Sequence, residues 1–268
     1  MAKVSIATLE KAPDVALPPG FFGDVQTQGL FFQETDPLHL YLHKLVRDAR
    51  LRVGPTIVDC VLYVWKGAVE AGGRRLASGS SLIAEHGAAI EIQGSDENSL
   101  LLTFSAATAP TEGRAGGNIH LLPTERVPRV AKLAGTQGSG GAMHANAECP
   151  TCSVWLHENT LDPVAPEPGD SASEKGVHSH SENEVIFVVE GEMALGGRLC
   201  GPGTALAIAA ETLYSFGVGP QGLKFVNFRA ARPSDIKFKN GHKIDEVAFW
   251  RDRVPAPKYL KPMSADRP

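Results

Sequence analysis

Short apolar runs separated by glycine, proline and polar residues recur along most of the chain. Examples rich in β-branched or aromatic residues are EVIFVVEG (184–191), TALAIAAE (204–211) and LKFVNFRA (223–230). Runs of this length, bounded by turn residues, predict strands, and many of them at even spacing predict a β-sandwich or barrel. The pattern therefore indicates an all-β fold with few short helices.

One segment departs from this pattern. In PLHLYLHKLVRDAR (37–50), Leu38, Leu42 and Leu45 recur at helical spacing, which predicts a helix. In the second half of the chain, the polar loop PVAPEPGDSASEK (163–175) takes the corresponding place.

The chain contains an internal repeat. The stretch FVVEGEMALGGRLCGPGTALAI (187–208) aligns without gaps on YVWKGAVEAGGRRLASGSSLIA (63–84), at an offset of 124 residues. The same offset places Trp155 on Phe31 and Phe225 on Leu101, so we expect one register over about residues 29–107. A register of this length indicates two copies of one structural unit. The Gly-Gly pairs at 72–73 and 196–197 suit hairpin turns that need positive φ.

The repeat predicts three consecutive regions. Residues 1–112 would form an N-terminal barrel, 113–235 a C-terminal barrel, and 236–268 a tail or arm. The tail is polar and proline-rich, and an arm laid across a neighbour is favoured because Phe249-Trp250 would be poorly placed in a solvated tail. GTQGSGGAM (135–143) is typical of a flexible connection.

Composition narrows the function classes. The 268 residues carry a formal net charge of −4, which leaves no basic surplus for binding a phosphate backbone, so nucleic acid is excluded as an expected partner. The sequence has no apolar stretch typical of a signal peptide or a membrane span, so we expect a cytoplasmic protein without membrane contact. Four cysteines in a chain of this length predict free thiols there.

The segment GVHSHSENEVIFVVEG (176–191) carries the candidate chemistry. His178 and His180 lie two residues apart, so on a strand both imidazoles point to one face. Glu184 has the same parity if the intervening turn keeps phase, and Ile186 and Val188 would form an apolar floor. Two imidazoles and a carboxylate suit a divalent transition metal and leave positions open for water or substrate.

The run G-x-H-x-H-x3-E-x6-G resembles the first metal-binding motif of the cupins, with a shortened interval between the glycine and the first histidine. Pro202-Gly203 and IAAETLYSF (208–216) resemble the second motif. Where that motif has its histidine, this chain has Tyr214. The resemblance is good in the second copy and weaker in the first. It implies a bicupin, two tandem double-stranded β-helix (jelly-roll) barrels, and a homodimer.

Tyr214 leaves three interpretations open. It could bind the metal directly, although a neutral phenol with a pKa near 10 is a weak ligand. It could instead donate a hydrogen bond to a bound water or substrate, which suits a catalytic acid or base. It could also only fill the barrel.

The first copy lacks the ligand set. The offset places Gly54, Thr56 and Cys60 opposite the two histidines and the glutamate, so we expect the N-terminal barrel to be metal-free. Glu85 and His86 have no partners at ligand spacing and are interpreted as surface residues.

Four further candidates remain. Cys149 and Cys152 form a CxxC, which could be half a zinc site, a redox pair, or two thiols at the mouth of a strand. His157 would lie on the barrel wall and contact substrate, or be a satisfied core or surface histidine. Asn227 and Arg229 alternate with apolar positions, and either could orient an anionic substrate.

These observations predict an enzyme with one divalent transition metal per chain, held by His178, His180 and Glu184, acting on a small polar organic substrate. Fe(II) or Mn(II) is favoured, with Zn(II) or Ni(II) as alternatives. An oxygenase is the first choice, because this ligand set leaves several positions open. The resemblance also implies isomerases, hydrolases and lyases. The competing hypothesis is a non-enzymatic bicupin that binds a small ligand.

Overall fold

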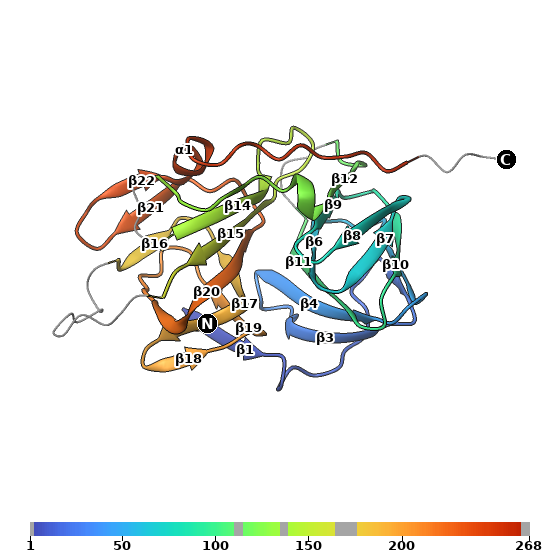
Figure 1. The fold of residues 1–268 in the computed structure, drawn as a ribbon, viewed down its shortest axis with the longest axis horizontal. Helices are drawn as coiled ribbons and strands as arrows, with labels where there is room; N and C mark the ends of the chain where they lie inside the picture. The colour runs from blue at the N-terminus through green and yellow to red at the C-terminus, as the bar shows by residue number, and fades with distance from the viewer. Residues whose placement is uncertain (1–2, 110–114, 135–138, 164–175, 264–268) are drawn as a thin grey trace. The chain divides into compact units, whose positions relative to one another are not determined.

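The computed structural model describes residues 3–109, 115–134, 139–163 and 176–263 (Figure 1). The chain forms two compact units that alternate along the sequence. We call residues 11–127, 147–154 and 257–268 the N-terminal barrel, and residues 1–10, 128–146 and 155–256 the C-terminal barrel. Each unit therefore recruits segments from beyond the consecutive regions expected from the repeat.

The N-terminal barrel consists of two antiparallel sheets. One has the strand order β12-β9-β6-β11-β4-β3 and the other β2-β5-β10-β7-β8. Leu51, Val53, Leu62 and Ile92 are fully buried members of its apolar core. Its elements are β2 (Phe21–Gly23), β3 (Gln26–Phe31), β4 (Leu38–Leu45), β5 (Arg50–Val53), β6 (Cys60–Lys66), β7 (Ala68–Ala71), β8 (Arg74–Ala77), β9 (Ser81–Ala84), β10 (Ile90–Gly94), β11 (Ser99–Ala106), β12 (Ile119–Leu122) and the 3₁₀ turn η1 (Thr124–Arg126).

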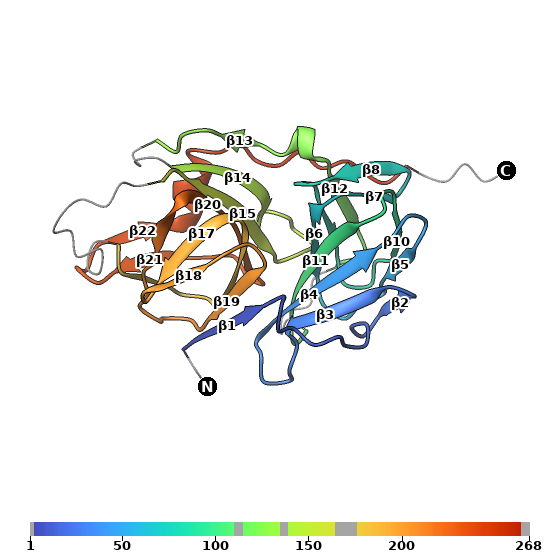
Figure 2. The same cartoon turned by 60° about the horizontal axis from the view of Figure 1, so that its bottom comes forward.

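One sheet of the C-terminal barrel follows the plan of the larger N-terminal sheet, with β19, β17, β20, β15 and β14 in the places of β9, β6, β11, β4 and β3. This sheet runs β1-β19-β17-β20-β15-β14-β13, and β1 from the start of the chain pairs with β19 (Figure 2). A smaller sheet has the order β16-β21-β22. The elements are β1 (Val4–Thr8), β13 (Arg129–Val130), β14 (Ser139–Asn146), β15 (Trp155–Leu161), β16 (His178–His180), β17 (Glu184–Leu195), β18 (Arg198–Cys200), β19 (Thr204–Ile208), β20 (Gly217–Arg229), β21 (Asp235–Phe238), β22 (Lys243–Asp245) and α1 (Glu246–Arg251).

The helix predicted over residues 37–50 is wrong: Leu38–Leu45 is strand β4. This strand pairs with β3 on one side and β11 on the other, and six of its eight residues are buried. Because both faces are covered, apolar residues do not alternate cleanly, and leucines at helical spacing arise by coincidence.

The repeat register also needs correction. The offset of 124 relates β6 to β17 and β11 to β20, but β4 corresponds to β15 at a different offset. Val226 pairs with Glu158, whereas Leu102, 124 residues before Val226, pairs with Leu42. Glu158 and Leu42 differ by 116, so β15 aligns eight residues away from the predicted position. The second copy is longer by eight residues between β15 and β17 than the first is between β4 and β6.

The glycine pairs behave as predicted. Gly72, Gly73, Gly196 and Gly197 all have positive φ, between 54° and 79°, and the first pair joins β7 to β8. Within the described residues the helical elements are η1 and α1, and neither is long or apolar enough to cross a membrane.

Candidate functional site

The C-terminal barrel contains a cavity of about 220 Å³ that is partly open to the surface. Its walls combine aromatic and aliphatic side chains with a few polar groups, an arrangement typical of small-molecule sites. The polar groups come from β14, β15, β16, β20 and α1, and from Tyr214 between β19 and β20. The residues used below that line it are His157, His178, His180, Ile186, Tyr214, Phe225, Asn227, Arg229, Glu246 and Trp250.

Strand β16 holds both predicted histidine ligands at this cavity. His178 and Tyr214 exchange two backbone hydrogen bonds, with N–O distances of 3.0 and 2.9 Å, so the tyrosine is fixed beside the strand. The rings of His178 and His180 lie 5.1 Å apart, nearly perpendicular. Both imidazoles line the same cavity, which is consistent with two residues of equal parity on one strand.

Glu184, the first residue of β17, is 1% exposed and lies next to His180. Its Oε2 is 3.8 Å from Nε2 of His180. The same oxygen accepts hydrogen bonds from Nδ2 of Asn227 at 2.7 Å and from Nη2 of Arg229 at 3.0 Å. The carboxylate is therefore anchored by two donors from β20.

Glu246, the first residue of α1, is a site residue that was not predicted from the sequence. Asp245 caps this helix by accepting a hydrogen bond from the Ala248 amide at 2.8 Å, which places Glu246 toward the site. Its carboxylate contacts Nδ1 of His180 at 2.9 Å and Nη1 of Arg229 at 2.7 Å. An aspartate preceding an apolar Val247 and Trp250 is a helix-start signal that could have indicated α1.

A buried charge network results. Arg229 is 0% exposed and contacts two carboxylates, those of Glu184 and Glu246. Burial alone would raise the pKa of Glu246, but the charge of Arg229 and the hydrogen bond with His180 hold it well below the usual range. Burial would also raise the pKa of Glu184, but His180 and Arg229 lower it below its usual value. With neutral imidazoles, two carboxylates against one guanidinium leave a net charge of −1, which favours a further cation.

The donor set fits a divalent metal. Nδ1 of His178 donates to the Gly176 carbonyl at 2.6 Å, which leaves its Nε2 to bind an ion. Nδ1 of His180 lies 2.9 Å from Glu246 and 3.0 Å from Nη2 of Arg229, and the tautomer that donates to Glu246 leaves Nε2 of His180 to bind the same ion. Two ligand atoms about 2.1 Å from one ion stand about 3.0–3.4 Å apart, close to the 3.8 Å between His180 and Glu184. Arg229 would compete with a metal ion for Glu184, because it already donates a hydrogen bond to that carboxylate.

Tyr214 lies beside this network. The side chain is 8% exposed and experiences the negative charge of Glu184. Burial, and then the negative charge of Glu184, raise the pKa of the phenol well above its usual value. The hydroxyl is therefore protonated and available as a donor.

The three predicted substrate-binding residues all line the cavity. His157 accepts a hydrogen bond at Nδ1 from the indole of Trp155 at 2.7 Å, and its ring lies 4.3 Å from that of Trp250. Burial lowers the pKa of His157 to about 3, so it is neutral. Asn227 and Arg229 point their donors at Glu184, and Arg229 is already paired with two carboxylates.

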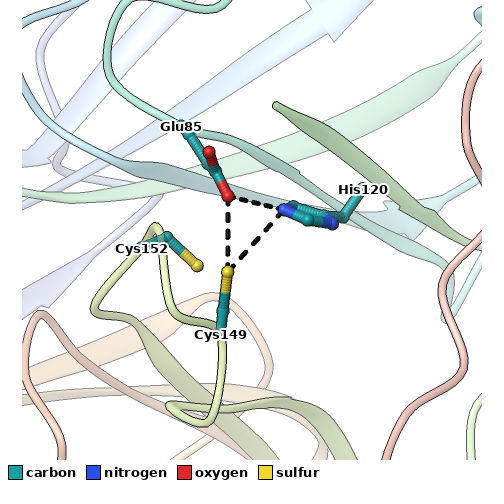
Figure 3. A group of neighbouring side chains, drawn as sticks. All are labelled: Glu85, His120, Cys149 and Cys152. Carbon is teal, nitrogen blue, oxygen red and sulfur yellow. Dashed lines mark hydrogen bonds and ion pairs between the residues drawn. The ribbon is translucent and has the colours of Figure 1, made fainter. Parts of the chain in front are cut away.

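A second group of ligand-type side chains lies in the N-terminal barrel. The ligand atoms of Glu85, His120, Cys149 and Cys152 all lie within 4.8 Å of one another, and the group could hold a metal ion (Figure 3). Glu85 is 0% exposed, so its interpretation as a surface residue is wrong. This group could not be predicted from residue spacing, because its members are up to 67 residues apart in the sequence.

No protein-family model and no curated protein matches the sequence. Solved structures do match. The protein Ylba from E. coli is 15% identical with a TM-score of 0.63, over 86% of this chain and 91% of that chain. A proposed dioxygenase from Nostoc punctiforme is 9% identical with a TM-score of 0.63, over 91% and 86%. A deletion mutant of Bacillus subtilis oxalate decarboxylase is 11% identical with a TM-score of 0.58, over 90% and 79%.

At these identities the likeness concerns the fold. The chain has the all-β jelly-roll fold of the cupins, as the resemblance in the sequence predicted.

Proposed function

We propose that the C-terminal barrel is a metal-dependent enzyme site for a small polar organic molecule, with His178, His180 and Glu184 as metal ligands. One observation carries the proposal: a 220 Å³ cavity presents two imidazoles, each with Nδ1 engaged, beside a buried carboxylate. This is how proteins orient histidines toward a metal. The structural likeness to a proposed dioxygenase and to an oxalate decarboxylase supports the same class.

Oxygenase chemistry is our first choice for the reaction. Three protein ligands leave open positions, and Fe(II) or Mn(II) bound there would supply Lewis-acid or oxygen-activating chemistry. Around it, Ile186 and Phe225 form apolar walls. Tyr214 holds a proton on its hydroxyl, where it can be donated to substrate.

The polar wall selects the substrate. His157 is neutral and offers a ring nitrogen, and Asn227 offers the amide group that anchors Glu184. Arg229 is occupied by two carboxylates, so it contributes less positive potential to the cavity than a free guanidinium would. A cavity of about 220 Å³ lies below the range of drug-sized ligands, which favours a molecule of a few carbon atoms.

The test is metal content followed by ligand screening. Purified protein reconstituted with Fe(II) or Mn(II) should bind the ion, and His178→Ala with His180→Ala should lose it. His39→Ala, a half-buried histidine on β4 of the other barrel, is the matched control. Small polar acids and amides would then be screened by thermal shift with each metal. Metal retained unchanged by the double variant would refute the ligand assignment.

A second function, binding a small ligand without catalysis, is favoured by one observation. The guanidinium of Arg229 already lies 3.0 Å from Glu184, so it supplies positive charge to the network without a metal. A screen that finds a ligand for metal-free protein, with no gain in affinity when metal is added, would support this alternative.

A further inference from the structure

Four side chains of types that can bind metals converge in the N-terminal barrel from three separate segments. Glu85 directly follows β9, His120 lies on β12, and Cys149 and Cys152 lie on residues 147–154 (Figure 3). Pairing of β9 with β12 brings the first two together, and the Glu85 amide donates to the Asn118 carbonyl at 3.1 Å. The CxxC spacing then supplies two thiols from one short segment.

The distances suit a tetrahedral ion. Sγ of Cys149 lies 3.4 Å from Oε1 of Glu85 and 3.9 Å from Nε2 of His120. With a metal–sulfur distance of about 2.3 Å and metal–nitrogen or metal–oxygen distances of about 2.1 Å, tetrahedral geometry requires about 3.6 Å for both pairs. Nε2 of His120 and Oε1 of Glu85 are 2.7 Å apart, in direct hydrogen bond, and this pair must open to about 3.4 Å.

The carboxylate of Glu85 is held for this task. Its Oε2 accepts from the Asn118 amide at 2.9 Å and from the Asn118 side chain at 2.8 Å, which orients Oε1 toward His120 and Cys149. Thr151 donates to Oε1 at 2.6 Å. Burial raises the pKa of Glu85, but the hydrogen bonds from His120, Thr151 and Asn118 outweigh it and lower the pKa to about 2. A buried anion therefore stands beside two thiols.

We propose that Glu85, His120, Cys149 and Cys152 bind a zinc ion, making the N-terminal barrel a metal site distinct from the cavity of the C-terminal barrel. Two thiolates, one imidazole and one carboxylate are soft-to-borderline donors that suit Zn(II). Four protein ligands leave no open position, which is typical of a structural rather than a catalytic site.

Binding is balanced in protons and charge. The thiols of Cys149 and Cys152 each release one proton to solvent, and the proton on Nε2 of His120 moves to Nδ1. Two thiolates, the Glu85 carboxylate and Zn(II) then sum to −1. Asn118 and Thr151 already donate to that carboxylate and can spread the charge.

The redox interpretation of the CxxC fits less well. Cys152 is 1% exposed, and burial, a hydrogen bond to Cys149, and the charges of Cys149, Asp59 and Glu85 all raise its thiol pKa. Reactive cysteines have the opposite surroundings, with a lowered pKa and access to solvent. Negative neighbours that disfavour a lone thiolate favour a cation at the centre of the group.

The test is X-ray absorption at the zinc edge on full-length protein titrated with zinc and freed of excess. We expect about one zinc per chain with two sulfur ligands at about 2.3 Å. Cys149→Ser with Cys152→Ser should remove this sulfur-bound zinc, while Cys200→Ala, at a buried cysteine outside the group, should keep it. The wild-type spectrum decides even if the double variant folds poorly.

Three results would overturn the proposal: wild-type protein that binds no zinc, zinc coordinated only by nitrogen and oxygen, or sulfur-bound zinc that persists without Cys149 and Cys152. His178→Ala with His180→Ala separates the two barrels. Sulfur-bound zinc should be unchanged in that variant, so failure of one metal assignment leaves the other intact.

Discussion

Glu246 offers a sharp test of the cavity site, because it lies beyond the sequence motif and acts through His180. In Glu246→Gln the side chain keeps its volume, but the charged acceptor of the 2.9 Å contact to Nδ1 of His180 is lost. The 2.7 Å ion pair with Arg229 is lost as well. Arg229 keeps its contact with Glu184 at 3.0 Å, so the guanidinium is not left unpaired.

The magnitude follows from the role of the contact. Removing a carboxylate that orients a metal-binding histidine lowers the metal affinity by about 10–100-fold. That range corresponds to about 1.4–2.7 kcal/mol. The buried network also changes from −1 to neutral when the imidazoles are neutral, which weakens attraction for a cation in the same direction.

The assay is competition of Fe(II) or Mn(II) between the protein and a chelator of known affinity, at constant pH. Glu211→Gln is the matched control, because Glu211 is a half-exposed carboxylate whose ion pair with Lys237 lies outside the cavity. We expect the control to stay within about twofold of wild type. An affinity for Glu246→Gln that also stays within about twofold would refute the idea that this carboxylate prepares His180 for metal binding.

Three further outcomes are expected. Tyr214→Phe should retain metal while turnover falls by about 10²–10⁴-fold, as for loss of a general acid, and measured loss of metal would instead make Tyr214 a ligand. Arg229→Met leaves Glu184 and Glu246 buried without a counter-charge, so urea unfolding of metal-free protein at pH 7 should show a loss of about 3–5 kcal/mol, and a loss below about 1 kcal/mol would contradict the network. Burial lowers the pKa of His43 to about 3. Its neutral form therefore stabilises the fold fully above the unfolded value near 6.5, and this contribution falls as pH drops toward 3. Over that window His43→Gln should reduce the slope of unfolding free energy against pH by up to about 1.4 kcal/mol per unit, and an unchanged slope would count against a neutral buried histidine.

Local patterns in the sequence predicted much of the fold. The strand runs and the Gly-Gly turns are local signals, and they led to the all-β architecture and to the hairpin at Gly72-Gly73. The helix prediction for residues 38–45 was wrong because burial on both faces of β4 removes the period of two that identifies a strand. The predicted repeat register was wrong at β15 because an ungapped alignment cannot account for the eight additional residues between β15 and β17.

Site residues could likewise be predicted where the signal was local and were missed where it was not. His178 and His180 reach one cavity because parity on a strand is a local property. Glu246 contacts His180 across 66 residues, and Glu85 meets Cys149 across 64, so neither pairing has a sequence signal at short range. Such groups come together only in the folded chain. In the N-terminal barrel, for example, β9 pairs with β12, and residues 147–154 pack in the same unit.

The most direct test of the central claim is anomalous diffraction from crystals of the full-length protein grown with Mn(II) or Fe(II). We predict an anomalous peak within about 2.0–2.3 Å of Nε2 of His178, Nε2 of His180 and an oxygen of Glu184. Arg229 should then remain paired with Glu246. Crystals with no peak at these three atoms, and with Arg229 still donating to Glu184, would contradict the account.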